Sequence, residues 1–275
     1  MNPIYKSSTG NEWIYSHRGL ISNEDPSKQI SVTRTEIKEL LNHYPQALYI
    51  RWVSDLDKTE KINDYYYVLR DKEYDISELP SRSRSQVRKC LRNCEIKKVS
   101  GVEIVNGGGY NVYLQEINRF SRRGMQSGHI LTESEFTHWM KSETQDLWVA
   151  FHESRVIGYA ICRPVGESLN LVTWKADYTH YSSLYPSYGM LYTMVNEYMS
   201  SGQYKYVFDG GRSMTEHSNV QEFLLTKMAF RKADARLQTY IRPWLKPALF
   251  ILAPFEPLIK NVKLRSIIRL YKWSK

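Results

Sequence analysis

The clearest hydrophobic pattern lies between residues 95 and 241, where short apolar runs alternate with segments of helical spacing. Three apolar runs separated by short turns predict an antiparallel meander. Helical periodicity precedes and follows them. The expected elements are strand 95–99, helices 112–123 and 133–142, strands 147–152, 155–163 and 168–174, helix 188–201, strand 204–208, helix 219–229 and strand 236–241. This order, β-α-α-β-β-β-α-β-α-β, predicts a mixed α/β domain.

An N-terminal extension, residues 1–94, has the same alternation of strand-like and helical segments. Strands are expected at 11–21, 46–53 and 64–70, and helices at 35–44 and 77–94. In the second helix Arg84, Arg88 and Arg92 recur every four residues along one face. Such a face could bind phosphates, or it could be an ordinary solvated surface.

The C-terminal tail, residues 243–275, departs from this alternation. Its first half is strongly apolar but contains four prolines, so it cannot form one straight helix. The segment VKLRSIIRLYKW then alternates basic and apolar residues at helical spacing. That composition suits an interfacial helix on an anionic membrane. The alternative is a segment that packs its apolar side on the body of the protein.

Charge is concentrated in the same tail. Of the net charge of +9 over 275 residues, +7 falls within 241–275, where Glu256 is the one acid. The nearly neutral remainder does not favour DNA binding. Three cysteines give no disulfide framework and no zinc pattern, so no metal is expected. Neither a signal peptide nor an apolar run of roughly 18 residues is present, which predicts a cytoplasmic protein, at most peripheral on the membrane.

Candidate chemistry gathers in the stretch 204–230. A short apolar strand ends in Asp209-Gly210-Gly211-Arg212-Ser213, and a helix follows. A polar strand end beside a helix N-terminus is where α/β proteins often bind ligands. The same pattern also describes an ordinary crossover with a polar loop.

Three short stretches carry a family resemblance: Pro186 to Tyr192 at a helix start, Phe208 to Ser213, and Lys227-Met228-Ala229-Phe230. Together with the element order from 95 to 242, they resemble the GCN5-related N-acyltransferase (GNAT) superfamily, in its Fem-type or BioF2-like branch. The resemblance implies a mixed twisted sheet flanked by helices. Residues 1–94 would then be a degenerate second GNAT-like half.

The resemblance also implies where an acyl donor binds. In this fold the donor lies in a splay after the third meander strand, so its carbonyl would meet the backbone at Val172, Thr173 or Trp174. The phosphates of acetyl-CoA or another acyl-CoA would meet amides at the next helix start, formed by Ser187, Tyr188, Gly189 and Met190. The family's usual phosphate loop is Gln/Arg-x-x-Gly-x-Gly/Ala. Here Pro186 and Leu191 replace its first and last residues.

The expected catalytic residues are Asp209, His217 and Ser213, with Asp209 and His217 as the acid–base groups. Many family members place a tyrosine five residues before the closing Phe, whereas Leu225 occupies that position here. His217 could accept an amine proton through water, or be merely solvated. Asp209 could act as the base or cap the glycine turn.

Three further residues complete the expected site. Arg212 could bind the acceptor or a phosphate, or pair with Asp209 to fix the loop. Asn219 could cap the last helix or line the donor cleft. Lys227 is assigned to the acceptor, although a cation late in a helix also favours the helix dipole.

The sequence therefore predicts an N-acyltransferase that moves an acyl group, acetyl in the simplest case, from a CoA or carrier-protein thioester to an amine acceptor such as an amino sugar or amino acid. One alternative is a FemAB-like transferase that uses aminoacyl-tRNA, with the arginines of 84–92 and the tail touching RNA. Another is a non-catalytic GNAT-like binding module, held at the membrane surface by residues 243–275.

Overall fold

The computed structural model describes residues 3–58, 64–122, 129–213 and 219–274. The chain divides into two compact units that interleave in sequence. The first unit contains Met1–Val68, Gly210–Glu216 and Lys232–Lys275, and the second contains Leu69–Asp209 and His217–Arg231. The division into 1–94, 95–242 and 243–275 concerns family domains, and it stays a prediction.

The meander of the second unit is present as expected. Strands β7 (Asp146–His152), β8 (Arg155–Val165) and β9 (Ser168–Ala176) pair antiparallel in sequence order. Strand β6 (Glu95–Val99) pairs antiparallel with β7, and β10 (Tyr206–Gly211) pairs parallel with β9. With β5 (Tyr66–Arg70) and β11 (Arg231–Asp234), the full strand order is β11-β5-β10-β9-β8-β7-β6. Strands β5, β10 and β11 each contain a point where the chain passes from one unit to the other.

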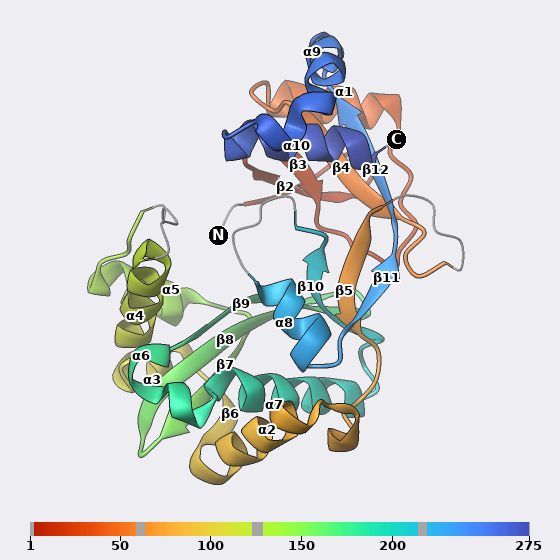
Figure 1. Ribbon diagram of the computed structural model, residues 1–275. Helices are drawn as coiled ribbons and strands as arrows, with labels where there is room; N and C mark the ends of the chain where they lie inside the picture. Colours follow the sequence, from red (N-terminus) through yellow and green to blue (C-terminus); the bar gives the residue numbers. More distant parts are fainter. Residues whose placement is uncertain (1–2, 59–63, 123–128, 214–218, 275) are drawn as a thin grey trace. The chain divides into compact units, whose positions relative to one another are not determined.

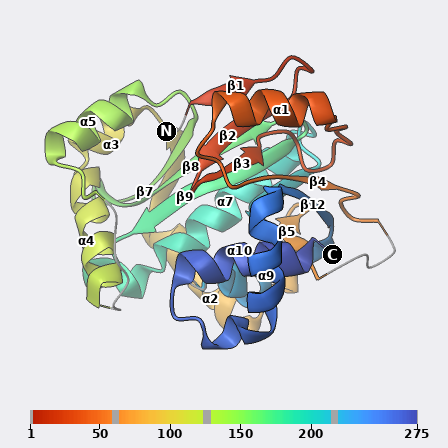
Figure 2. The same cartoon turned by 90° about the horizontal axis from the view of Figure 1, so that it is seen from above.

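Helices cover both faces of the meander, because side chains alternate between the faces of a strand. Leu147 and Val149 of β7 belong to a core with Phe136, whereas the indole of Trp148 donates to Tyr198 Oη on the opposite face (2.8 Å). The face of the Phe136 core carries α3 (Gly101–Asn106), α4 (Gly109–Arg122) and α5 (Glu133–Ser142), and the opposite face carries α2 (Ser81–Asn93) and α7 (Pro186–Ser200). Figure 2 shows α3, α4 and α5 together on one side of β7.

Short elements complete the second unit (Figure 1). Its 3-10 turns are η1 (Ile76–Glu78) and η2 (Ser182–Leu184), and its remaining helices are α6 (Tyr178–Tyr181) and α8 (Val220–Lys227). Helices α3 and α6 and strand β11 were not expected from the sequence. They are four to six residues long, too short for a periodic pattern to stand out.

The turn after α8 explains the Lys-Met-Ala-Phe stretch. Ala229 adopts a left-handed conformation (φ 48°), which ends a helix and disfavours large side chains. Its carbonyl accepts a hydrogen bond from Arg70 Nη1 (2.8 Å), and the Met228 carbonyl accepts one from Tyr74 Oη (2.7 Å). The backbone geometry at 229 favours glycine, and alanine adopts it at a small cost.

The first unit contains a five-stranded mixed sheet. Its strands are β1 (Ile4–Lys6), β2 (Glu12–Ser16), β3 (Gly19–Ser22), β4 (Tyr49–Ser54) and β12 (Arg236–Ile241), in the order β1-β2-β3-β4-β12. The segment 11–21, expected as one strand, is a hairpin. His17 and Arg18 form its turn with positive φ angles of 50° and 61°. Neither is the Gly or Asn that usually announces such a turn.

Helices also lie on both faces of this sheet (Figures 1 and 2). On one face α1 (Arg34–His43) buries Leu40 with Trp13 and Leu20. On the other, α9 (Lys246–Leu252) and α10 (Val262–Trp273) pack on β12 and β4, joined by η3 (Pro243–Leu245) and η4 (Ala253–Leu258). Leu249, Ile268 and Leu270 are fully buried there, so one side of the tail packs on the body.

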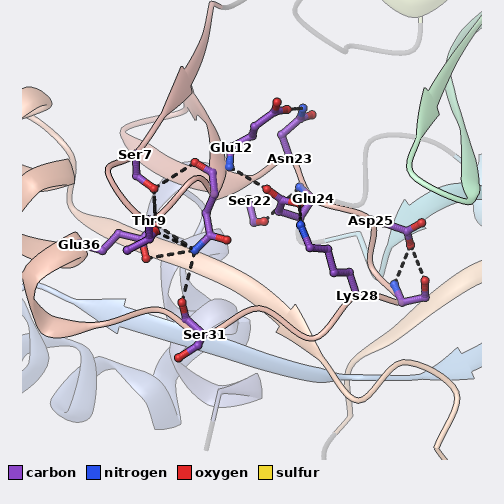
Figure 3. A network of polar contacts seen from close by, with 12 residues as sticks. Ser7, Thr9, Glu12, Ser22, Asn23, Glu24, Asp25, Lys28, Ser31 and Glu36 are labelled. Atoms are coloured by element: carbon purple, nitrogen blue, oxygen red, sulfur yellow. Dashed lines mark hydrogen bonds and ion pairs between the residues drawn. The ribbon is translucent and has the colours of Figure 1, made fainter.

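A buried polar network joins β2 to α1 in the first unit (Figure 3). The carboxylate of Glu36 is fully buried and accepts hydrogen bonds from Ser7 Oγ (2.6 Å), Asn11 Nδ2 (3.1 Å) and Trp13 Nε1 (3.0 Å). Buried carboxylates need such donors, because leaving water is costly without them. This one fixes the first turn of α1 against the hairpin.

The expected mixed α/β fold, with mixed sheets flanked by helices, is thus confirmed. No helix within the described ranges is long and apolar enough to span a membrane.

Candidate functional site

The central feature of the second unit is the point where β9 and β10 stop pairing. Their parallel register runs from Ser168 opposite Tyr206 to Asn170 opposite Phe208. Strand β9 continues to Ala176 and β10 to Gly211. The pairing of the two strands therefore ends at Asn170 and Phe208. This is where the resemblance places a splay after the third meander strand.

A β-bulge lies at the same place in β9. In its pairing with β8, Thr173 lies opposite Ile161 and Leu171 opposite Cys162, so Val172 is an extra residue. Bulges leave a residue out of the regular ladder and redirect the chain, often beside active sites. The Val172 side chain is 40% exposed. The bulge is a backbone irregularity at one of the three positions predicted to meet a donor carbonyl.

Aromatic rings bring two other predicted donor residues together. The ring of Phe223 on α8 lies edge-on to Trp174 of β9 and to Tyr188 of α7, with centroid distances of 6.0 and 5.0 Å. Tyr185 contacts Tyr188 in turn at 6.0 Å, and the Lys89 ammonium lies 5.7 Å from the Tyr185 ring. Strand β9 and helix α7 thus both contact α8 at the side chain of Phe223.

The start of α7 is built tightly. Tyr185 precedes it in a left-handed conformation (φ 55°), and Pro186 is its first residue. Ser187 is buried and hydrogen-bonded to Tyr178, whose pKa burial raises to about 12. Among the described residues no side chain caps this helix start, but the Tyr188 amide donates to the Tyr185 carbonyl (3.0 Å) and the Gly189 backbone is hydrogen-bonded to Cys90. The positive end of the helix dipole still lies here.

Gly189 and Met190 are also packing residues. A Cβ at Gly189 would lie 2.4 Å from Cys90 Sγ and 2.8 Å from Ile96 Cδ1, so only glycine lets α2 approach α7 so closely. Met190 is fully buried, with its terminal methyl close to Gly158. Contact with a donor at these two positions can come only from the backbone.

Asp209 is the first residue of β10 beyond its pairing with β9. Burial raises the pKa of its carboxyl from the ordinary 3.8 to about 7, against a hydrogen bond with Gln221 that lowers it. Desolvation favours the neutral acid, whereas the amide favours the carboxylate. A carboxyl that titrates near neutrality can both accept and return a proton, as a general base must.

Each of the two glycines after Asp209, both in the first unit, is required by a different feature of the structure. Gly210 has a φ of +108°, which other residues rarely adopt. A Cβ at Gly211 would lie 2.0 Å from the Tyr65 hydroxyl. The Asp-Gly-Gly sequence is therefore fixed by backbone conformation and close packing.

The remaining predicted residues lie in different settings. Arg212 belongs to the first unit, where its Nη1 donates to the Asp64 carbonyl (2.6 Å) and its guanidinium lies 4.5 Å from the Trp273 ring centroid. Ser213 is exposed. Asn219 occupies the N-cap position of α8 without a side-chain cap bond, and Lys227 is exposed in its last turn. His217 lies outside the described residues.

A second polar cluster was missed by the sequence reasoning. Glu116 of α4 is only 5% exposed, and both of its oxygens accept from Arg119 (2.8 and 2.5 Å). The Arg119 guanidinium lies 5.3 Å from the ring of Tyr178, and the Lys175 ammonium lies 5.6 Å from the ring of Tyr113. A buried carboxylate, two cations and two phenols thus meet beside β9.

Lys175 is the reactive candidate in this cluster. Burial lowers its pKa, partly opposed by the charge of Glu116. It lies opposite Tyr159, whose hydroxyl is buried without a hydrogen-bond partner among the described residues. The available sequence signal was Glu116, a carboxylate four residues after Val112 on the apolar face of a helix.

Among the described residues no cluster of His, Cys, Asp and Glu could hold a metal ion. The arrangement instead offers backbone groups at a strand bulge, a helix start, and two ionisable groups with pKa values moved toward neutrality. These are elements suited to binding a carbonyl compound and moving a proton.

No protein-family model matches this chain, and a search of curated proteins found no match. Solved structures do match. The C-terminal domain (DUF2156) of a protein assigned as a lysylphosphatidylglycerol synthetase from Agrobacterium fabrum has a TM-score of 0.54 at 9% identity, covering 91% of this chain and 86% of that one. FemX also has a TM-score of 0.54, at 11% identity, with coverages of 86% and 85%. The chain shares the fold of these two structures. At these identities the likeness shows the fold and not the reaction.

Proposed function

We propose that this protein is an N-acyltransferase that moves an acyl group from a thioester, of CoA or a carrier protein, to an amine acceptor such as an amino sugar or an amino acid. The observation that carries the proposal is the separation of β9 from β10, with a bulge at Val172 on one strand and Asp209 on the other. A strand pair that opens next to a titrating carboxyl supplies the two needs of acyl transfer, a place for the carbonyl and a proton acceptor.

The proposed reaction uses backbone groups for the donor. An N–H in the segment Val172–Trp174 would donate to the thioester oxygen and stabilise the charge that develops there. The amine nitrogen attacks the carbonyl carbon, the new C–N bond forms and the C–S bond breaks. The leaving thiolate takes a proton from solvent.

Asp209 takes the proton that the amine loses. Its pKa of about 7 leaves a large fraction ionised at neutral pH, while its basicity exceeds that of an ordinary aspartate. Lys175, whose pKa burial lowers, is a second candidate to accept the proton of the amine. Arg212 and Lys227 remain candidates for acceptor binding, and His217 and Ser213 remain candidates for catalysis.

The start of α7 would hold the donor's phosphates. The positive end of its dipole lies at Ser187 to Met190 and has the polarity that a phosphate needs. Trp174, Tyr188 and Phe223 offer an aromatic surface beside them. CoA thioesters and acylated carrier proteins are cytoplasmic molecules, in keeping with the cytoplasmic location expected from the sequence.

A Fem-type transferase that takes aminoacyl-tRNA is the second candidate. The fold likeness to FemX and the loss of the usual phosphate-loop residues at 186 and 191 favour it. Arg88 and Arg92 on α2 are exposed and could meet RNA phosphates. Arg84 is less suited, because its Nη1 already donates to the carbonyls of Ser77 and Leu79.

A donor-binding experiment separates these candidates. Saturating acetyl-CoA should raise the melting temperature by about 2–4 °C or more if the protein binds it. Labelled acetyl transfer to a panel of amines then tests turnover. Asp209→Asn should lower turnover at least about 100-fold, while Glu153→Gln, at a side chain 87% exposed, should leave it unchanged.

Other outcomes assign the other functions. Tight binding of charged tRNA that weakens steeply with salt, with no response to acetyl-CoA, would support the Fem-type reaction. Failure to bind or turn over any of these donors would overturn both enzyme proposals and leave a non-catalytic binding module.

A further inference from the structure

The C-terminal tail has an outer side that the fold does not bury. Among the described residues ten large apolar side chains are exposed, and half of them fall within 15 consecutive positions. We call these five the tail patch: Trp244 (65% exposed), Phe250 (66%), Ile251 (64%), Phe255 (54%) and Leu258 (77%). An apolar cluster of this kind is uncommon on a surface that meets only water.

The exposure is not a sign of a poorly formed segment. Leu249, next to Phe250, is fully buried in the core that also contains Ile268 and Leu270. The tail is therefore anchored on one side and apolar on the other. Pro243, Pro247, Pro254 and Pro257 break it into short turns, so it can lie along a surface but cannot cross a bilayer.

Charge around the tail patch is positive. Lys246, Lys260 and Lys263 are exposed beside it in the sequence. The acid of the segment, Glu256, is buried and neutralised by Arg269 (2.8 Å) and Lys272 (3.1 Å). No exposed carboxylate therefore opposes the lysines in the described part of the tail.

We propose that the tail patch inserts into the headgroup region of an anionic lipid bilayer, with the lysines on the lipid phosphates. Apolar side chains with a Trp, flanked by lysines, are the composition of interfacial membrane segments. A second copy of this chain fits less well, because a symmetric contact would bring two tails of the same positive charge together. Nucleic acid would leave the five apolar side chains exposed. This inference does not depend on the proposed acyl transfer.

Vesicle flotation of the full chain tests the proposal. Vesicles of phosphatidylcholine with 30% phosphatidylglycerol should carry the protein upward, and pure phosphatidylcholine vesicles should not. The double variant Phe250→Ser/Ile251→Ser should lose flotation. Val102→Ser/Ile130→Ser is its matched control, since these residues are 46% and 47% exposed elsewhere, and it should float like the unaltered chain.

The charge contribution is tested in the same assay. Each lysine near an anionic surface contributes about a fivefold gain in partitioning, so Lys246→Gln/Lys260→Gln/Lys263→Gln should lose about a hundredfold. Lys28→Gln/Lys72→Gln/Lys205→Gln lowers the net charge equally at side chains 59–63% exposed and should lose little. Trp244 emission should shift to the blue with anionic vesicles, and Trp244→Phe should remove that change.

The proposal is overturned if the unaltered chain ignores anionic vesicles, or if it floats equally with neutral ones. It is also overturned if the matched controls lose as much flotation as the tail variants. A concentration-dependent dimer that Phe250→Ser/Ile251→Ser dissociates, without any vesicle binding, would assign the tail patch to self-association instead.

Discussion

Two partly or fully buried carboxylates, one in each unit, have opposite surroundings. Glu36 lies between α1 and the β2–β3 hairpin, where a serine, an asparagine and a tryptophan donate hydrogen bonds to it. Asp209 lies where β10 leaves β9, and burial outweighs its hydrogen bond with Gln221. The first carboxylate is held by its neighbours, and the second is left with a pKa near 7.

The difference shows how a buried polar group can be classified. A carboxylate whose lone pairs are satisfied stabilises the fold and has little reason to react. A carboxylate that burial leaves close to neutrality costs stability, and such groups concentrate at functional sites. On this argument the carboxylate of the first unit is structural, and the carboxylate of the second unit is the one that we propose for chemistry.

The largest expected effect is on turnover. Asp209→Asn removes the proton acceptor, so kcat should fall by about 100- to 10,000-fold. The melting temperature at pH 8 should stay the same or rise, because a buried charge is removed. Steady-state kinetics with thermal unfolding of the same preparation measures both. A variant that unfolds early would make Asp209 a structural residue like Glu36.

Glu36→Gln should show the reverse. The new amide group would bring donors to a site already filled with donors, so the free energy of unfolding should fall by about 2–4 kcal/mol. Turnover per folded molecule should stay close to that of the unaltered protein. Urea unfolding followed by circular dichroism provides the measurement, and an unchanged midpoint would show that the network contributes little.

A glycine substitution tests whether close packing against α2 excludes a larger residue at the start of α7. Gly189→Ala should cost about 1–3 kcal/mol, because its Cβ would overlap Cys90. Gly158→Ala is a graded control, since its nearest neighbour would be 3.0 Å away at the flexible end of Met190. Equal stability of the two variants would contradict the close packing of α2 on α7.

The last expected effect is a pH dependence with opposite signs for activity and stability. The folded-state pKa of Asp209 is raised, so between about pH 4 and 7 the folded protein holds a proton that the unfolded chain releases. Stability should therefore fall as pH rises through this window and level off above it. Activity should rise over its upper part. Asp209→Asn should remove both trends, and an unchanged stability profile in that variant would assign the titration to another group.

The sequence predicted the meander and its flanking helices because each is long enough to show a regular apolar period. It also singled out Asp209 as a polar group after an apolar run, although β10 continues to Gly211 and only its pairing with β9 ends before Asp209. Ala229 and the two glycines matched a family pattern whose cause is visible only as φ angles and close contacts.

The rest depended on tertiary pairing. The bulge at Val172 arises from the register between β8 and β9, which no local pattern encodes. Arg119 of α4 and Lys175 of β9 belong to one cluster because the fold brings these distant parts of the chain together. The exposed side of the tail could not be separated from its buried side, because Leu249, Phe250 and Ile251 are equally apolar in sequence.

Hydrogen exchange with and without donor tests the central claim most directly. If the opening between β9 and β10 holds the acyl group, acetyl-CoA or charged tRNA should slow exchange of amides in residues 171–176 and at the start of α7. Amides of the Glu36 network should be unaffected. Binding of either donor that leaves residues 171–176 unchanged, with protection elsewhere, would contradict the account.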